Sequence, residues 1–545
     1  MSLRTALLLP VATAALVASG AAPALAGPSW TPSEPLADLT PDRVGPPVLD
    51  VNAAGDAVLA AVQSSFVGPS RVVAFARGAG GTWHPAALQP DGSRNVGGPH
   101  VAVDGSGRSI VAWVASDGSR ASSPYVEYTL FARGAEADVT GGRPQLHEIA
   151  TRDGATVSGL EVAVGMSGDL AAVWYDEAHD EVQAATGTIT HGFSAPFPLA
   201  VASGRVLTTQ VGVDAVGDAV FAWEVSAGDR HTVLATTLPQ GEAPGPTVVL
   251  DGDQPGAAAT GPSLSVTPDG QTLLAWDQHR YDDPHEVRYA VRTHSLSSSF
   301  ASGTWSEVGR VSREGEGTNG AAPTAVLTPQ DLAVVTYGDD AQHLVAASRP
   351  DGGEFGGHEQ LSAAGQEVYG PASLDAGYRG ALAVSFRAYD AEGSSTTVSA
   401  WRGATDTAFG HAVEEPVGGG SSIGVDGEGN AYLAGTVSEC LDQKCYDHAS
   451  SIAARIFDPV APTLRGVSTV VRRAGRASTF TAMGVADRIS EPTVTWTFGD
   501  GTAAVTGESV RHRFRKPGTY RVRTVVEDAA GNRTRHVTKV HVRRR

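Results

Sequence analysis

The chain has 545 residues, with 59 Asp and Glu against 40 Lys and Arg, which gives a formal net charge of −19 at pH 7. The charge is uneven: 17 of the basic and 6 of the acidic residues lie between Pro462 and Arg545, so this segment carries +11 and the remainder −30. An acidic body of that size repels phosphates, which excludes nucleic acid as its ligand.

The first 26 residues have the features of a secretory signal peptide. Arg4 supplies a positive start, Leu7 to Val17 an apolar core, and Ala24 to Ala26 a small-residue cleavage site. No later stretch reaches the roughly 18 apolar residues of a membrane helix. We therefore expect cleavage after Ala26 and a secreted, extracellular, monomeric protein without a membrane span.

One pattern recurs eight times between Val44 and Ala434. An apolar run ends in Asp or Asn, a Gly turn follows, and a second apolar run closes on an aromatic residue in the clearest copies, such as V-A-V-D-G-S-G-R-S-I-V-A-W (Val101 to Trp113). The aligned closing positions, 49 to 61 residues apart, are Ala61, Trp113, Trp174, Trp223, Trp276, Tyr337, Phe386 and Gly435. A repeat of this length made of strands and turns predicts a propeller or a β-solenoid.

Each unit contains four strand-like runs, which favours a propeller over a solenoid. We therefore predict an all-β fold with an eight-bladed β-propeller over residues 27–460. Because the units around Pro323 and Gly380 are degenerate, a seven-bladed propeller is the alternative. The strand-like segment from Trp30 to Leu36 precedes the first unit, whereas the last unit lacks an outer strand. We expect this segment to complete the last blade and close the ring.

The aromatic residues that close the second runs invite two interpretations. They resemble sugar-stacking platforms, but a large ring at one fixed place per unit is more typical of packing between neighbouring sheets. The repeat logic therefore predicts that Trp113, Trp174, Trp223 and Trp276 are core residues.

The connections between second and third strands are variable and polar, and they all open on one face, where function usually resides. The candidate ligand-binding residues there are Asp176, Glu177, His179 and Asp180 in unit three, and His279, Asp282, Asp283 and His285 in unit five. These residues could bind Ca²⁺ or another divalent ion, could act as paired carboxylates in glycosidic chemistry, or could be solvated loop charges. Units three and five are two blades apart, which weakens the idea of a shared site.

Two cysteines fall in the corresponding connection of the last unit. Cys440 and Cys445 are five positions apart in a chain that we expect to be exported, so we predict a local disulfide between them.

The segment 461–545 carries the most specific motifs of the chain: W-T-F-G-D-G (Trp496 to Gly501), R-H-R-F-R-K-P-G-T-Y-R-V (Arg511 to Val522) and V-E-D-A-A-G-N (Val526 to Asn532). In order and spacing they resemble the PKD domain, an immunoglobulin-like β-sandwich. The resemblance implies an accessory module of secreted or surface proteins, without catalytic residues. Trp496 is expected to be buried in this sandwich.

The same segment has an unusual basic load. Arg511, Arg513 and Arg515 alternate along one predicted strand and should share a face. They suggest either contact with an anionic wall polymer or a solvated strand face.

No zinc helix, nucleophile elbow, phosphate-binding glycine loop or cysteine cluster occurs in the sequence. We therefore expect an extracellular binding protein rather than an enzyme, one that recognises polysaccharide, cell-wall polymer or protein through the variable loops. The alternatives are a glycoside hydrolase or lyase with a PKD-like accessory domain, and a scaffold in a surface assembly.

Overall fold

The computed structural model describes residues 29–36, 43–64, 70–86, 88, 95–116, 125–131, 146–149, 156–251, 257–280, 284–293, 303–440 and 448–544. The expected signal peptide, Asp282, Asp283 and Cys445 lie outside these residues. Every element in the described part of the chain is a β-strand. No described helix has the length and apolar character that crossing a bilayer requires.

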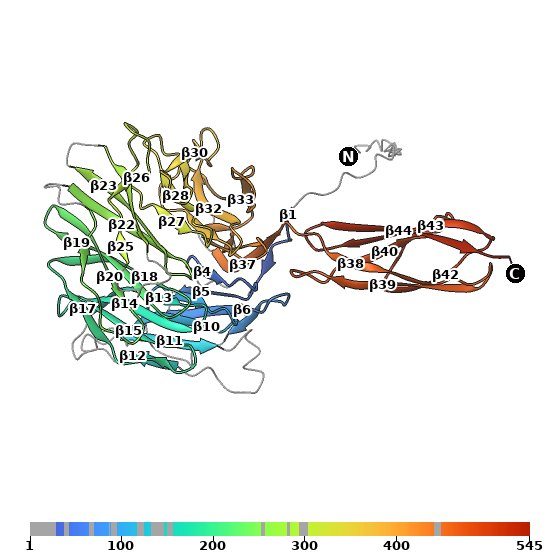
Figure 1. Cartoon of the computed structure of the whole chain (residues 1–545), viewed down its shortest axis with the longest axis horizontal. Coiled ribbons are helices and arrows are strands. Elements are labelled where there is room, and N and C mark those ends of the chain that lie inside the picture. Colours follow the sequence, from blue (N-terminus) through green and yellow to red (C-terminus); the bar gives the residue numbers. More distant parts are fainter. Residues whose placement is uncertain are drawn as a thin grey trace, which may run out of the picture.

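The described strands up to residue 458 form eight antiparallel sheets of four or five strands, arranged as blades around a central axis (Figure 1). Blade 1 consists of β3 (Arg43–Val44), β4 (Val48–Val51), β5 (Ala57–Ser64), β6 (Arg71–Arg77) and β7 (His84–Ala86), and blade 2 of β8 (Asn95–Val96), β9 (His100–Val103), β10 (Ser109–Ser116), β11 (Tyr125–Phe131) and β12 (Leu146–Ile149). Blade 3 consists of β13 (Val157–Val164), β14 (Asp169–Asp176), β15 (Glu181–Thr188), β16 (Gly192–Phe193) and β17 (Phe197–Val201), and blade 4 of β18 (Arg205–Val213), β19 (Ala219–Ala227), β20 (Arg230–Leu238) and β21 (Val248–Val249).

Blade 5 consists of β22 (Ala257–Val266), β23 (Thr272–Arg280), β24 (Glu286–Thr293), β25 (Thr304–Trp305) and β26 (Gly309–Arg310), and blade 6 of β27 (Thr324–Leu327), β28 (Ala333–Gly338), β29 (Leu344–Arg349) and β30 (Gly356–Gln360). Blade 7 consists of β31 (Ser373–Ala376), β32 (Leu382–Tyr389), β33 (Ser395–Arg402) and β34 (Val413–Glu415). Blade 8 consists of β35 (Gly418–Val425), β36 (Ala431–Cys440) and β37 (His448–Asp458), together with the N-terminal strands β1 (Ser29–Trp30) and β2 (Glu34–Pro35). The eight-bladed propeller is confirmed, and the alternative of seven blades is wrong.

The ring is closed by the N-terminal strands, as predicted. Both β1 and β2 pair antiparallel with β37, with Trp30 opposite Phe457. Across the closing seam, Leu59 and Ala61 of blade 1 pack against Tyr432 of blade 8 in one buried cluster. The first and last strands of the propeller therefore share a blade, so that no blade edge is left open at the seam.

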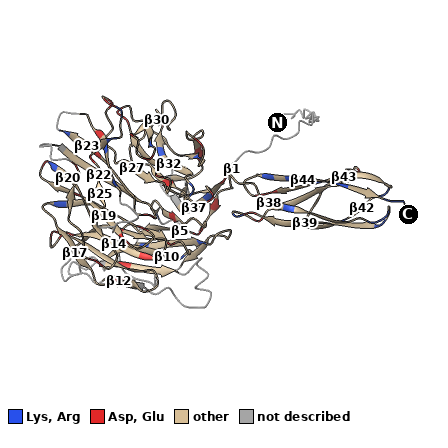
Figure 2. Cartoon of the chain, in the orientation of Figure 1, with Lys and Arg blue, Asp and Glu red and all other residues tan. Residues whose placement is uncertain are grey.

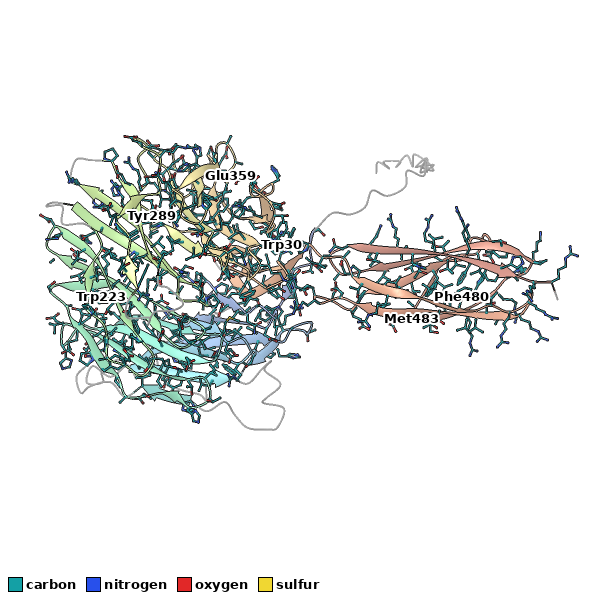
Figure 3. The ribbon with its side chains drawn as sticks, in the orientation of Figure 1. Trp30, Trp223, Tyr289, Glu359, Phe480 and Met483 are labelled. Atoms are coloured by element: carbon teal, nitrogen blue, oxygen red, sulfur yellow. The ribbon has the colours of Figure 1, made fainter. Side chains whose placement is uncertain are left out.

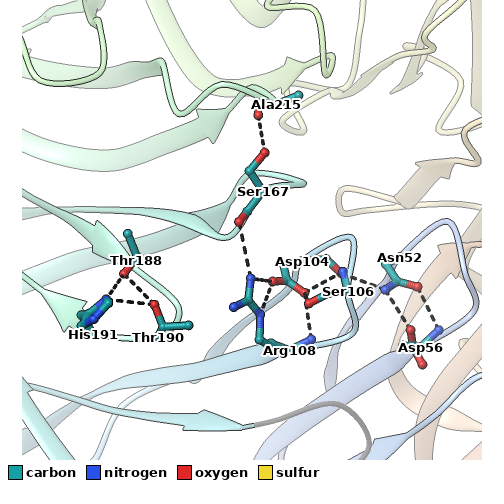
Figure 4. Close-up of polar contacts among 10 residues, drawn as sticks. All are labelled: Asn52, Asp56, Asp104, Ser106, Arg108, Ser167, Thr188, Thr190, His191 and Ala215. Carbon is teal, nitrogen blue, oxygen red and sulfur yellow. Dashed lines mark hydrogen bonds and ion pairs between the residues drawn. The ribbon is translucent and has the colours of Figure 1, made fainter.

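The repeated Asp-x-x-Gly step forms the turn between the first and second strands. In blade 2 the Asp104 Oδ1 accepts hydrogen bonds from the backbone N–H of Ser106 (2.9 Å) and of Arg108 (2.8 Å), as Figure 4 shows. Gly107 has φ of +86°, a left-handed conformation that favours glycine. The pattern in the sequence therefore has a local cause: the carboxylate and the glycine together set the turn.

These turns also join neighbouring blades and define what we call the turn face. The Ser167 hydroxyl donates to the Ala215 carbonyl of the next blade (2.6 Å, Figure 4). At the closing seam the Gly427 N–H donates to the Ala53 carbonyl (3.0 Å). Such bonds satisfy backbone groups that a turn would otherwise leave to water.

The closing aromatics are core residues, as predicted. Trp113, Trp174, Trp223 and Trp276 are each at most 1% exposed. Trp113 packs against blade 1 and Trp223 against blade 3, so each ring fills the space between its own sheet and the preceding one. Trp223 lies inside the propeller in Figure 3. The side chains are therefore not available as sugar platforms.

The C-terminal part is a two-sheet sandwich that extends from the propeller as an arm (Figure 1). One sheet is β38 (Thr463–Val470), β39 (Ala477–Ala486) and β42 (Ser509–Arg513), and the other is β40 (Thr493–Thr497), β41 (Val505–Thr506), β43 (Gly518–Glu527) and β44 (Arg533–Val542). Trp496 is fully buried, as expected, and packs with Phe480, which Figure 3 labels within the arm. Arg511, Arg513 and Arg515 are all exposed, and Figure 2 marks the positions of basic residues in blue along the ribbon of the arm.

Candidate functional site

Two places in the propeller gather polar and titratable groups: the central channel and the loop face, where second and third strands connect. At the turn face the channel forms a cavity of about 270 Å³. Its lining includes valines of several inner strands together with Asp375 and Tyr378. The loop face lies at the opposite end of the strands.

The channel carboxylates bind backbone N–H groups of the next inner strand. Asp50 Oδ2 accepts from the Val103 N–H (2.7 Å), and Asp375 Oδ2 accepts from the Val425 N–H (2.7 Å). Burial, together with the nearby charge of Asp50, raises the pKa of Asp375 to about 7, against the lowering effect of its backbone hydrogen bonds.

Elsewhere in the channel, serine hydroxyls accept the corresponding backbone hydrogen bonds. Ser265 of blade 5 holds the position of Asp375 in its repeat, and its hydroxyl accepts from the Leu327 N–H (2.9 Å). Ser373 and Ser422 accept from inner-strand N–H groups in the same way. Because a neutral hydroxyl serves equally well, the channel carboxylates are best understood as structural acceptors rather than as a catalytic pair.

The loop face carries a repeated pair of a different kind, which we call the acid–histidine pairs. In each of blades 3 to 6 a buried carboxylate at or near the end of the second strand contacts a histidine Nδ1. The pairs are Asp176–His179 (2.7 Å), Glu224–His231 (2.7 Å), Asp277–His285 (2.6 Å) and Asp339–His343 (3.2 Å). The four histidine side chains are 26% to 36% exposed.

The carboxylates have a structural role as well. Glu224 also accepts from the Gly261 N–H of the next blade (3.0 Å), and Asp277 accepts from the Thr318 hydroxyl (2.8 Å). The acids thus position the histidines while joining the blades. Holding Nδ1 on a carboxylate sets the imidazole tautomer and leaves Nε2 as the second polar atom of the ring, which in His231 lies 3.4 Å from the Ser226 hydroxyl.

Blade 5 has the densest group. His279 stacks on His285 with ring centroids 4.0 Å apart, and its Nδ1 lies 3.7 Å from Asp277. Burial, and then the proximity of His285, lower the pKa of His279, although Asp277 acts in the opposite direction. These three residues have ligand atoms close enough to share a metal ion. Two imidazoles and one carboxylate suit a transition metal rather than Ca²⁺, which prefers oxygen ligands.

The four candidate residues of unit three, which were selected from the sequence, make different contacts in the structure. Asp176 and His179 form one pair, while Asp180 accepts a hydrogen bond from Tyr175 (2.8 Å) and Glu177 lies 3.9 Å from Arg205.

Units three and five do not form one cluster, but they belong to one row, because the pair on blade 4 lies between them. Sequence reasoning missed Glu224, His231, Asp277, Asp339 and His343. Glu224 and Asp277 directly follow the closing tryptophans of their repeats, and this position was the available signal.

Beyond blade 6 the loop face continues with aromatic residues. Tyr369 is 58% exposed, and its ring meets Tyr389, at the end of β32, edge to face at 5.5 Å. The Val368 N–H donates to the carbonyl of Gln342, the residue before His343. The segment that carries Tyr369 therefore adjoins the acid–histidine pair of blade 6. An exposed tyrosine beside polar groups is suited to stacking on a ligand that also forms hydrogen bonds.

Three solved structures are similar to this chain at low identity. The BP39L lectin from Burkholderia pseudomallei is 12% identical (62% of this chain, 94% of that chain, TM-score 0.40), and the Penicillium chrysogenum alpha-L-arabinanase complexed with arabinobiose is 14% identical (70% and 99%, TM-score 0.37). An Aleuria aurantia lectin mutant is 12% identical (68% and 95%, TM-score 0.35). At these identities and TM-scores the similarity says nothing about ligand or activity.

No curated protein matches the sequence. Residues 459–542 match the family model described as PKD domain. The match covers both sheets of the C-terminal sandwich. The arm of this protein is a PKD domain.

Proposed function

We propose that this is a secreted protein that binds polysaccharide or cell-wall polymer through the loop face of its propeller. The observation that carries the proposal is the row of acid–histidine pairs on four consecutive blades, next to the exposed ring of Tyr369. An extended ligand with many hydroxyls matches such a row, because partly exposed imidazoles can form hydrogen bonds and the tyrosine offers a stacking surface.

Co-sedimentation of the mature protein with insoluble polysaccharides and purified cell walls tests this proposal. We expect His231→Ala and Tyr369→Ala each to weaken binding at least about tenfold, the effect of losing about 1.4 kcal/mol. The matched control is His84→Ala, because His84 is exposed on the outer strand of blade 1, away from the loop face. Equal binding by all variants would overturn the proposal, and capture of an extracellular protein instead would change the ligand class.

A second candidate is a polysaccharide lyase or glycoside hydrolase that uses the same face. The specific observation is His279: its lowered pKa favours the neutral imidazole, the form that is able to accept a proton. The supernatant of the binding assay distinguishes the two. Release of sugars that stops in the His279→Ala variant would establish the enzyme, and binding without release would establish the recognition protein.

A further inference from the structure

Three carboxylates meet where the propeller joins the PKD domain. Asp458 is the last residue of β37, Asp487 follows β39, and Asp528 follows β43. One oxygen of each lies within 4.8 Å of the other two. The group is thus built from one propeller residue and two loops of the PKD domain that are distant in the sequence.

The junction around this group is packed rather than open. Ile489 of the PKD domain is buried in the hydrophobic cluster of blades 1 and 8, and its carbonyl accepts from Arg77 Nη2 (2.8 Å). The Asn532 side chain donates to the Asp458 carbonyl (2.8 Å). Beside them is a cavity of about 370 Å³ whose lining includes Asp458 and Asp487.

Two of the three acids are buried with an oxygen that has no partner among the described residues. Asp458 is 1% exposed and Asp528 7% exposed. Each uses Oδ1 to accept a backbone N–H, from Val460 (2.9 Å) and from Asn532 (2.8 Å), while each Oδ2 is buried without a hydrogen bond. A buried acceptor that lacks a donor is costly, so a missing partner is indicated.

A further oxygen of the same kind lies nearby. Asn430 lines the same cavity and is 1% exposed; its Nδ2 donates to Asp426, whereas its Oδ1 is buried without a partner in the described structure. Arg488, a basic residue of the same lining, is paired with Glu428 at 3.0 Å. The charges that act on Asp458 are those of Asp487, Asp528 and Asp426, and all three are negative.

We propose that Asp458, Asp487 and Asp528 bind one Ca²⁺ ion that fastens the PKD domain to the propeller. Ca²⁺ binds six to eight oxygens at about 2.3–2.6 Å, so two ligands on opposite sides of the ion are at most about 5 Å apart, which the three carboxylates satisfy. The ion supplies the positive charge that the buried oxygens lack, and the Asn430 Oδ1 and water complete its shell. Because Asp458 directly precedes the segment 459–462 that leads into β38, the ion fixes the base of the arm.

Calcium titration of the chelator-treated, mature full-length protein by calorimetry tests this inference. We expect one ion per chain in the wild type and at least a tenfold loss of affinity in Asp487→Asn. This variant keeps the oxygen that accepts from the Ile489 and Ser490 N–H groups (2.9 and 2.8 Å) and removes only the charge. The control is Asp390→Asn, because Asp390 caps a comparable turn in the exposed hairpin of blade 7, through the Glu392 and Ser394 N–H groups.

A second measurement does not depend on how the variant folds. Proteolysis of the wild type within residues 459–462 should be faster in chelator than in calcium, by at least about tenfold, whereas added Mg²⁺ should protect less. Absence of both calcium binding and protection at millimolar Ca²⁺ would overturn the inference. Equal calcium affinity in the wild type and a folded Asp487→Asn variant would also overturn it.

Discussion

Replacing Asp375 by serine tests whether the channel carboxylates are structural acceptors. The change converts the inner strand of blade 7 into the form of blade 5, where Ser265 performs the same hydrogen bond with a neutral hydroxyl. The Val425 N–H keeps an acceptor on β31, and the like charge opposite Asp50 is removed. We expect the variant to be more stable than the wild type at alkaline pH.

The size of the effect follows from the pKa of Asp375, which is about 7 in the folded protein against an ordinary value of 3.8. The folded state binds this proton more tightly than the unfolded state, so the wild type loses stability as pH rises from about 4 and the loss is complete above about 7. At about 1.4 kcal/mol per pKa step the loss is at most about 4 kcal/mol. Two of these steps lie between pH 5 and pH 8, so the advantage of Asp375→Ser should be about 3 kcal/mol larger at pH 8 than at pH 5.

Scanning calorimetry of wild type and variant at pH 5 and pH 8 measures this difference. The reverse change, Ser265→Asp, is the matched control and should destabilise blade 5 more at pH 8 than at pH 5. A gain that does not depend on pH, or a loss of stability at pH 8, would refute the reasoning. Loss of sugar binding or of sugar release in a stable Asp375→Ser protein would instead assign chemistry to the channel.

Three further predictions concern the scaffold. Trp223→Ala should destabilise the propeller by about 3–5 kcal/mol, measured by thermal unfolding, because it leaves a cavity between blades 3 and 4; a smaller loss than that of the exposed Val201→Ala would contradict this. A chain that starts at Arg43 lacks β1 and β2, so blade 8 should become sensitive to proteases while the PKD domain stays resistant; an unchanged digestion pattern would show that the seam does not need them. Cys440 and Cys445 should resist alkylation until reduced, and modification of both in native protein would disprove the predicted disulfide.

Much of the fold could be predicted from the sequence, because its signals are local and periodic. The Asp-x-x-Gly turn depends on contacts within five residues, as Asp104 and Gly107 show. The closing tryptophans are recognisable because a ring at a fixed place in a repeat has the same environment in every blade. Even the ring closure was predictable, since a surplus strand at Trp30 matched a missing strand in the last unit.

The candidate sites were only partly predictable. His179 and His285 stand out as polar loop residues, but their partners do not: Glu224 and Asp277 are buried acids at the ends of apolar strands, next to core tryptophans. A loop charge and a positioned imidazole look alike in a sequence. What distinguishes them is the buried carboxylate that fixes one ring nitrogen.

The junction depended entirely on tertiary structure. Asp458, Asp487 and Asp528 are separated by 29 and 41 residues, and each ends or follows a strand in a way that suggests only a turn. The sequence determined that a propeller and a sandwich would form, because strand periodicity and turns are encoded locally. Only the packing of the two domains brings three negative charges together, and the resulting demand for a cation arises from their burial at a shared point.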